Sequence, residues 1–399
     1  MKLAALLLIL SLAFSLPVCI SENQNPGLND LTGKHGFQMG ACLSYSDLKN
    51  KAYLEIVKTH FDSVTMTNEM KAYSLLDQRA SKKAKDGMPV MNYSKADAMV
   101  GWAKANGLKV RGHVLVWDAH MNDWFFREEY NSKKPYADAE TIKKRTEYYI
   151  TEVITHFEEK FPGVVFCWDV VNEAVGDNIT EYNVTDPRRV RTKRSGGDNL
   201  FYTLMGPDYV EHAFLYARQA VDALGADIGL YYNDYNAYFP DKAEAILNLA
   251  ESINTFKTDD SGNFVKLIDG IGMQGYIGGY GTQSGCLESS HLGMIKNQIL
   301  GYHAKGLDVQ ITEMAVRNYE TEYADKHADF YTKLFCVFTE LNSEGESILN
   351  SVSIWGLVDC PNLPKDNYSY KLNSPYGGLI SEKMEYKEVF NRVYTSLLD

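Results

Sequence analysis

Cysteine is scarce in this chain of 399 residues, which contains six. One of them, Cys19, lies in the apolar N-terminal segment, and the other five are widely spaced, without C-x-x-C or zinc-type spacing. This pattern excludes a disulfide scaffold and a structural zinc site, and it leaves a single disulfide open in an oxidising compartment. The five are Cys42, Cys167, Cys286, Cys336 and Cys360.

Positive charge is also in deficit. The chain has 40 Lys and Arg against 52 Asp and Glu, a net charge of −12. Proteins that bind nucleic acids carry basic faces, and anionic membranes attract basic segments, so we expect neither partner. A neutral or weakly charged substrate fits this composition better.

Long apolar runs are absent beyond the N-terminus, so no later segment is expected to cross a membrane. The chain opens with Met1-Lys2-Leu3 and an apolar run from Ala4 to Leu16. A positive start followed by a short apolar run is typical of a secretory signal peptide. We expect residues 1–21 to be this leader, with cleavage near Ser21, and the protein to be secreted from the cell.

No low-complexity linker or change of composition interrupts the chain after about residue 25, so we expect one domain over residues 25–399. Short apolar runs alternate with longer amphipathic stretches, the pattern of repeated βα units. Eight candidate strands with helices between them predict a closed (β/α)8 TIM barrel of the α/β class. The expected strands are Gln38–Leu43, Phe61–Thr65, Lys109–Val116, Val164–Asp169, Ile228–Tyr232, Ile268–Gln274, Leu307–Thr312 and Ser351–Trp355, and the clearest expected helices are Thr146–Lys160, Tyr209–Ala223 and Tyr323–Leu341.

Two glutamates stand at expected strand ends, where barrel enzymes place their active sites. Strand 4 runs into Asn172 and Glu173, and strand 7 runs into Glu313. Glycoside cleavage needs an acid for the leaving oxygen, and a retaining mechanism adds a carboxylate that attacks the anomeric carbon. Strands 4 and 7 lie across the mouth from each other, so we expect the carboxyls to approach to roughly 5 Å, the retaining separation.

Every candidate residue also has a plainer interpretation. A Glu after a strand suits a helix N-terminus, His113 can be a core histidine, Trp117 and Trp355 can be core aromatics, and Lys71 can be a solvated helix residue. Their joint placement at strand ends favours a site.

The segment Cys167–Ala174 resembles the acid/base signature of glycoside hydrolase family 10, the endo-β-1,4-xylanases. The resemblance covers almost the whole mature chain, in matching order and spacing. It implies a (β/α)8 barrel and a retaining mechanism with Glu173 as acid/base and Glu313 as nucleophile, without a metal or organic cofactor. The other matching segments are Phe61–Thr65, Asn68–Lys71, Val110–His113, Gly206–Val210, Tyr232–Asn236, Asp269–Gln274 and Trp355–Gly356.

The resemblance also implies a set of substrate-binding residues. Asn172 matches the amide beside the acid/base, and Trp355 matches an aromatic floor under the reacting sugar. The positions that match the glycone subsites are Asn68, Lys71, His113, Trp117 and Gln274. On this basis we expect a monomeric enzyme that cleaves internal bonds of the polysaccharide xylan. A retaining hydrolase of another β-glycan or β-glycoside stays open, as does a carbohydrate-binding relative without turnover, although both glutamates are retained.

Several positions depart from the pattern of the family. The departures cluster on the glycone side and put the preferred glycan in question. Tyr276 keeps a hydrogen-bond donor, so it can still bind sugar and orient Glu313. Asp118 adds an anion that is expected to raise the pKa of a neighbouring carboxyl. The departures are Thr67 for Glu, Asp118 for His, His120 for Gln, Tyr276 for His, Ala315 for Asp and, in a loose alignment, Leu363 for Trp.

A basic run, Arg188–Arg194, follows strand 4. One interpretation is a solvated loop. The other is a contact with acidic side groups of the substrate, such as glucuronic acid on xylan, because guanidinium groups bind carboxylates in a forked geometry.

Overall fold

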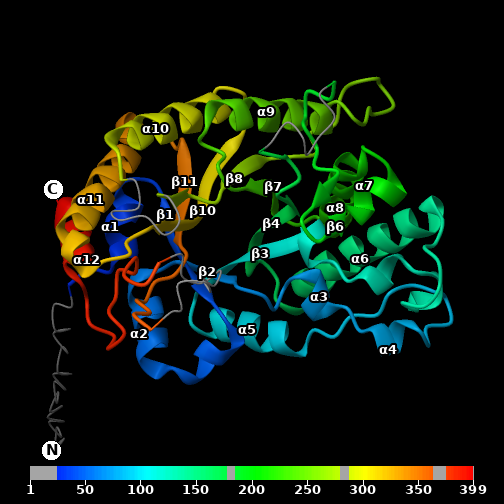
Figure 1. The fold of residues 1–399 in the computed structure, drawn as a ribbon, viewed down its shortest axis with the longest axis horizontal. Helices are drawn as coiled ribbons and strands as arrows, with labels where there is room; N and C mark the ends of the chain where they lie inside the picture. Colours follow the sequence, from blue (N-terminus) through cyan, green and yellow to red (C-terminus); the bar gives the residue numbers. More distant parts are fainter. Residues whose placement is uncertain (1–24, 178–184, 279–286, 363–373, 399) are drawn as a thin grey trace, which may run out of the picture.

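Eight parallel strands close into a barrel in the computed structural model, which describes residues 25–177, 185–278, 287–362 and 374–398. Each strand pairs with the next along the order β11-β1-β2-β3-β4-β7-β8-β10, and β10 pairs with β11 to close the ring. Helices surround the strands (Figure 1). The predicted (β/α)8 barrel is therefore confirmed. The strands are β1 (Gln38–Leu43), β2 (Ser63–Met66), β3 (Lys109–Val116), β4 (Val165–Asn172), β7 (Gly229–Asp234), β8 (Gly270–Met273), β10 (Asp308–Val316) and β11 (Leu349–Ile354).

The limits of β1 and β3 agree with the prediction, whereas β4 and β10 run three and four residues further than expected. The prediction ended these strands at the polar residues Asp169 and Thr312, but backbone pairing continues beyond them to Asn172 and Val316. A short strand, β9 (Tyr276–Ile277), pairs with Ala315 and Val316 and extends β10. Glu313 consequently lies inside β10 and not after it.

The helices between the strands form the outer layer. Those longer than eight residues are α2 (Lys51–His60), α5 (Ser94–Ala105), α6 (Ala139–Lys160), α8 (Tyr209–Leu224), α9 (Pro240–Asn254), α10 (Ser289–His303), α11 (Ala324–Leu341) and α12 (Glu388–Ser396). The shorter ones are α1 (Leu28–Lys34), α3 (Ala72–Leu75), α4 (Gln78–Ser81) and α7 (Leu200–Met205).

Helix α6 begins seven residues before the expected start at Thr146. Asp138 is its N-cap, and its carboxylate accepts a hydrogen bond from the backbone N–H of Thr141 at 2.9 Å. Such a cap satisfies one of the unpaired N–H groups of the first turn. The prediction began the helix too late because it followed the apolar stripe and overlooked this cap.

A polar network fills the barrel below the mouth. Arg111 on β3 is 1% exposed, and its guanidinium donates to the carboxylate of Asp169 on β4 and to the side-chain oxygen of Gln310 on β10. A buried charge is tolerated only when it is paired, and Arg111 has such a partner in Asp169. Because its two partners lie on β4 and β10, the network links three strands beneath the candidate site.

The two ends of the described chain meet on one side of the barrel. Helix α12 packs against α11, and α1 lies beside them (Figure 1). The hydroxyl of Tyr394 on α12 donates to the carbonyl of Pro26 at 2.8 Å. Among the helices of the described residues, none has the length and apolar character that a membrane span requires.

Candidate active site

The first candidate carboxylate, Glu173, lies directly after β4 at the mouth of the barrel. Its φ of 54° is in the left-handed region that residues other than glycine rarely adopt. Its backbone N–H donates to the carbonyl of Asn233 on β7 at 2.8 Å, which holds this conformation in place. Strained backbone of this kind clusters at functional sites.

The carboxyl of Glu173 is held on both oxygens. Nε2 of Gln274 donates to Oε1 at 3.1 Å, and the guanidinium of Arg194 donates to Oε2 at 3.2 Å. Arg194 belongs to a small hairpin formed by β5 (Lys193–Arg194) and β6 (Gly197–Asp198). The carboxyl therefore lies between the end of β8 and this hairpin.

The second candidate carboxylate, Glu313, is buried inside β10, with 5% of its surface exposed. Nδ2 of Asn233 donates to its Oε1 at 3.0 Å, and the hydroxyl of Tyr276 donates to its Oε2 at 2.5 Å. The register between β10 and β11 shifts between Ile311 and Met314. Irregularities of this kind redirect side chains next to active sites.

Three amides connect the two carboxyls. Asn233 and Gln274 both donate to Oδ1 of Asn172, at 3.0 and 3.2 Å. Together with their bonds to Glu313 and Glu173, they form a continuous chain of hydrogen bonds across the mouth. Nδ2 of Asn172 is buried and has no hydrogen-bond partner among the described residues, so it can donate to a ligand hydroxyl.

The sequence analysis did not single out Asn233 as a site residue, although it quoted the segment around it. Its position at the end of β7, between β4 and β8, was the available signal. It bonds both to Asn172 and to Glu313, so it sets the mutual orientation of the two sides of the site.

Burial raises the pKa of both glutamates above the ordinary value. Different groups oppose this effect in the two cases. For Glu173, the strongest opposing group is the guanidinium of Arg194. For Glu313, it is His113, followed by the hydroxyl of Tyr276 and then Lys71. The two carboxyls are thus placed in distinct electrostatic settings, as a division between acid and nucleophile requires.

His113 lies on β3 beside both candidate tryptophans. Its Nδ1 is 2.9 Å from Oδ2 of Asp169, whose carboxylate is also bonded to Arg111. The ring centroids of Trp355 and Trp117 lie 6.1 and 6.2 Å from that of His113. His113 is therefore a bonded, buried histidine, as the plainer interpretation held, and it also stands within the candidate site.

Lys71 is buried and not a solvated helix residue. Its Nζ donates to Oδ1 of Asn68 at 3.4 Å and lies 5.0 Å from the ring centroid of Trp117. Burial lowers the pKa of Lys71, and the carboxylates of Glu313 and Glu173 oppose this shift. The structure thus brings Asn68, Lys71 and Trp117 together with the catalytic candidates.

The departures from the family pattern contact different residues of the candidate site. Tyr276 bonds to Glu313, and its backbone pairs with Ala315. Thr67 is buried, and the ring of His120 lies 4.2 Å from that of Trp117. Leu363 lies outside the described residues.

The charge of Asp118 is compensated by a partner that was not predicted from the sequence. Asp118 does not act as an uncompensated anion, because Nε and a terminal nitrogen of Arg194 donate to its two oxygens at 2.7 and 2.9 Å. The pKa of Glu173 is raised by burial, while the same Arg194 lowers it. Sequence analysis missed this pair because the two residues are 76 positions apart.

Three arginines of the basic run Arg188–Arg194 have partners within the protein, whereas Lys193 in the same run is exposed. Arg188 donates to Asp186 and Glu211, and Arg191 is 4% exposed and donates to the carbonyl of Val175 at 3.2 Å. Arg194 binds Asp118 and Glu173. These three side chains are bonded within the protein, so they form neither a solvated loop nor a ready site for acidic side groups.

No group of three or more His, Cys, Asp or Glu side chains that could hold a metal ion occurs in the described part of the chain. The sequence-based expectation that catalysis needs no metal or organic cofactor stays a prediction. Cys286 lies outside the described residues, and Cys167, Cys336 and Cys360 form no disulfide.

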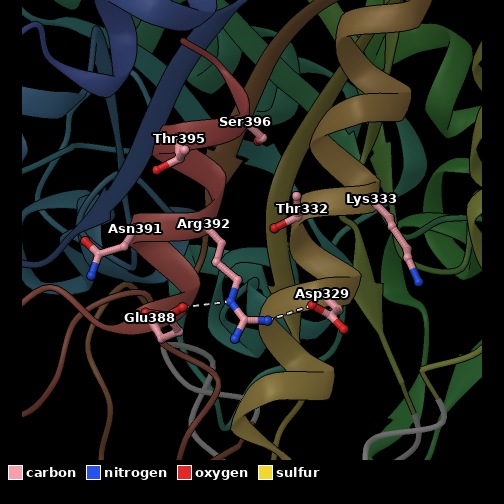
Figure 2. A pocket seen from close by; sticks show the side chains of 8 residues that line it. All are labelled: Asp329, Thr332, Lys333, Glu388, Asn391, Arg392, Thr395 and Ser396. Carbon is pink, nitrogen blue, oxygen red and sulfur yellow. Dashed lines mark hydrogen bonds and ion pairs between the residues drawn. The ribbon is translucent and has the colours of Figure 1, made fainter. Parts of the chain in front are cut away.

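A groove between α11 and α12 is one of the pockets on the surface away from the barrel mouth (Figure 2). Arg392 crosses it and donates to Asp329, Asp325 and Glu388. The groove is occupied by these internal ion pairs, and no residue predicted to belong to the active site lines it. The barrel mouth therefore remains the candidate active site.

Comparison with known proteins agrees with this geometry. Residues 27–395 match the family model described as glycosyl hydrolase family 10. A putative endo-1,4-beta-xylanase of Caldicellulosiruptor saccharolyticus is 35% identical over 298 residues, which are 73% of this chain and 86% of that protein. Endo-1,4-beta-xylanase A of Thermotoga maritima is 31% identical over 361 residues, which are 88% of this chain but only 28% of that protein.

A solved structure has the same fold. It contains the CBM22-1 and GH10 modules of the endo-1,4-beta-D-xylanase Xyn10B of Clostridium thermocellum in complex with xylohexaose. It is 24% identical with a TM-score of 0.75, and the match covers 92% of this chain and 67% of the other.

Proposed function

The chain belongs to glycosyl hydrolase family 10, and from this premise we propose that it is a secreted endo-β-1,4-xylanase that cleaves internal bonds of xylan with retention of configuration. The observation that carries the proposal is the pair of buried carboxyls, Glu173 and Glu313, joined through three amides across the mouth of the barrel. Two carboxyls at such a mouth are the minimum that retaining cleavage requires.

In this mechanism, Glu173 is protonated when the substrate binds. It gives its proton to the glycosidic oxygen while Glu313 attacks the anomeric carbon, and the leaving sugar departs. Burial supports the first role because it raises the pKa of Glu173 and favours the protonated form. Glu173 then removes a proton from the water that releases the sugar from Glu313.

Glu313 is suited to the role of the nucleophile because it is held by donors. The Tyr276 hydroxyl and the Asn233 amide each bond to one oxygen of Glu313, and both stabilise its charged form. The nearby cation Lys71 acts in the same direction.

The remaining candidates bind the sugars. The unpaired N–H of Asn172 is available to a sugar 2-hydroxyl, an interaction that strengthens in the transition state. Trp117, Trp355 and His113 supply flat surfaces for pyranose rings, and Asn68, Lys71 and Gln274 supply polar partners on the glycone side. These assignments rest on the family pattern and on the gathering of the side chains around the two glutamates.

The substrate assignment rests on the relatives, whose names give an endo-1,4-beta-xylanase activity. The secreted location rests on the N-terminal leader pattern, which lies outside the described residues. We also propose that the enzyme acts as a monomer, with neither a nucleic acid nor a membrane as partner.

Product analysis on purified xylan tests the proposal. An endo-acting enzyme releases a series of oligosaccharides and reduces the viscosity of the polymer early in the reaction. The same assay with other β-glycans tests the alternative substrates that the exchanges at Tyr276 and Ala315 leave open. Rapid cleavage of another β-glycan without cleavage of xylan would overturn the substrate assignment.

A further inference from the structure

We propose that Arg194, held by Asp118, is a positioning residue that fixes the carboxyl of the acid/base Glu173 and stabilises it in the charged state that follows proton donation. The proposal rests on the function proposed above, since it assigns Glu173 the acid/base role. It adds a group that the strand-end motifs do not contain, because Arg194 lies on the hairpin after β4.

The geometry of the guanidinium carries this proposal. Arg194 uses two of its nitrogens to bind both oxygens of Asp118, at 2.7 and 2.9 Å, a forked arrangement that fixes the plane of the guanidinium. The same side chain reaches Glu173 twice, at Oε2 over 3.2 Å and at the backbone carbonyl over 2.9 Å. One arginine therefore holds the side chain and the strained backbone of Glu173 together.

The contacts of Arg194 with Asp118 and Glu173 are strengthened because all three side chains are largely shielded from water. The side chain of Asp118 is 5% exposed, that of Glu173 is 13% exposed and that of Arg194 is 20% exposed. Charges that are withdrawn from water interact more strongly than charges on the surface. Asp118 stands where the family pattern has a histidine, so this departure supplies the anion that holds Arg194.

Proton transfer explains why such a residue is useful. When Glu173 donates its proton, the carboxyl becomes an anion between two uncharged neighbours, Gln274 and the departing sugar. The adjacent guanidinium compensates this developing charge without any rearrangement. It also retains the carboxylate in position for the second half of the reaction, when Glu173 acts as a base.

The other charged groups around Glu173 include one that raises its pKa and one that lowers it. Asp234 on β7 raises the pKa of Glu173, while Lys242 on α9 lowers it, and these two are bonded to each other at 2.8 Å. Lys71 and Glu313 face it from across the mouth. Because Arg194 is the strongest group that lowers the pKa of Glu173, its removal has the clearest expected sign.

The experiment compares the pH dependence of kcat/KM on a xylo-oligosaccharide for the wild type and for Arg194→Met. Activity requires protonated Glu173, so it declines as the pH rises through the pKa of that group. Loss of the guanidinium raises this pKa, and the alkaline limb is expected to move upward by about one pH unit. With an activated aryl xylobioside, which needs little protonation, the alkaline limb is expected to stay in place.

Two further variants separate charge from simple support. Arg194→Lys keeps the charge but not the fork, so its alkaline limb is expected to lie near that of the wild type while kcat falls. Asp118→Asn removes the anion that opposes the charge of Arg194. The alkaline limb of this variant is therefore expected to move to lower pH. If Arg194→Met does not fold, the proposal is tested with Asp118→Asn alone, whose alkaline limb is expected to shift to lower pH and not to higher pH.

Arg188→Met is the matched control, because Arg188 lies in the same loop and bonds to Asp186 and Glu211 without reaching Glu173. Its pH profile is expected to match that of the wild type. The proposal would be overturned if Arg194→Met had a reduced kcat on the xylo-oligosaccharide while the alkaline limb of its pH profile stayed at the wild-type position. A ¹³C NMR titration of the Glu173 carboxyl in the free proteins gives the same comparison without turnover, so inactivity of the wild type towards xylan would contradict only the proposed function.

Discussion

The hydroxyl of Tyr276 donates to Oε2 of Glu313 at 2.5 Å, at a position where the family pattern has a histidine. The phenol thereby stabilises the charged form of the proposed nucleophile and lowers its pKa against the effect of burial. Glu313 must be ionised to attack, so activity is lost as the pH falls through this pKa.

Tyr276→Phe is therefore expected to move the acid limb of kcat/KM to higher pH and to reduce kcat/KM. A hydrogen bond to a charged group contributes about 1.5–3 kcal/mol, which corresponds to a loss of roughly 10- to 100-fold. Initial rates over a pH series measure both effects. Tyr386→Phe is the control, since Tyr386 is exposed and bonds to His60 away from the mouth. An acid limb that stays in place in Tyr276→Phe would contradict the assigned role.

Glu173→Ala is expected to affect substrates according to their leaving groups. Xylan and xylo-oligosaccharides need protonation of the leaving oxygen, whereas activated aryl xylosides need little. The expected result is a much larger loss of kcat/KM on the first kind of substrate than on the second. Equal losses on both kinds would argue against Glu173 as the acid.

Arg111→Met is expected to destabilise the fold, because it leaves the carboxylate of Asp169 buried without its strongest partner. Removal of one member of a buried ion pair typically costs about 3–5 kcal/mol. Thermal and urea unfolding measure the change in the free energy of unfolding.

The matched control for this stability measurement is Arg392→Met on α12. Arg392 bonds to Asp329 and Glu388 in the groove of Figure 2 and also to Asp325, but its side chain is 33% exposed. Solvent weakens ion pairs that are open to it, so only a small change in the free energy of unfolding is expected. An Arg111→Met protein as stable as Arg392→Met would show that the network inside the barrel contributes little.

The double change Tyr276→His and Ala315→Asp restores the family residues at two positions that pair across β9 and β10. Weak glycone binding reduces turnover of short substrates most, because long substrates gain binding energy at remote subsites. We expect the wild type to have low activity on xylobiose and xylotriose, and the double change to alter the ratio of kcat/KM on xylotriose to that on xylan. An unchanged ratio would mean that these exchanges do not affect substrate binding.

The barrel was predictable from sequence because it depends on a repeated pattern. Each strand is a short apolar run and each helix an amphipathic stretch, so β1 and β3 could be placed to the residue. The ends of β4 and β10 were harder to predict, because the polar residues Asp169, Thr312 and Glu313 interrupt the apolar pattern before backbone pairing ends.

The two glutamates were also predictable, since strand ends in a barrel meet at one mouth. The groups that control the charge of the two glutamates were harder to predict. Asn233 was visible as a strand-end residue, but its bonds to Asn172 and Glu313 depend on the side-chain geometry of neighbouring strands. Arg194 was not predictable as a partner of Glu173, because a hairpin and a contact with Asp118 bring it there, and neither follows from local pattern.

The proposed mechanism requires that Glu313 forms a covalent bond with the sugar. Incubation with an activated 2-deoxy-2-fluoro xylobioside traps such an intermediate, because the fluorine slows both its formation and its hydrolysis, whereas the good leaving group speeds only its formation. Mass spectrometry of the intact wild type is expected to show one added 2-deoxy-2-fluoroxylobiosyl group per chain, and peptide mapping is expected to place it on Glu313. Glu313→Ala, by contrast, is expected to remain unlabelled. Labelling at another residue, or equal labelling of Glu313→Ala, would contradict the assignment of Glu313 as the nucleophile.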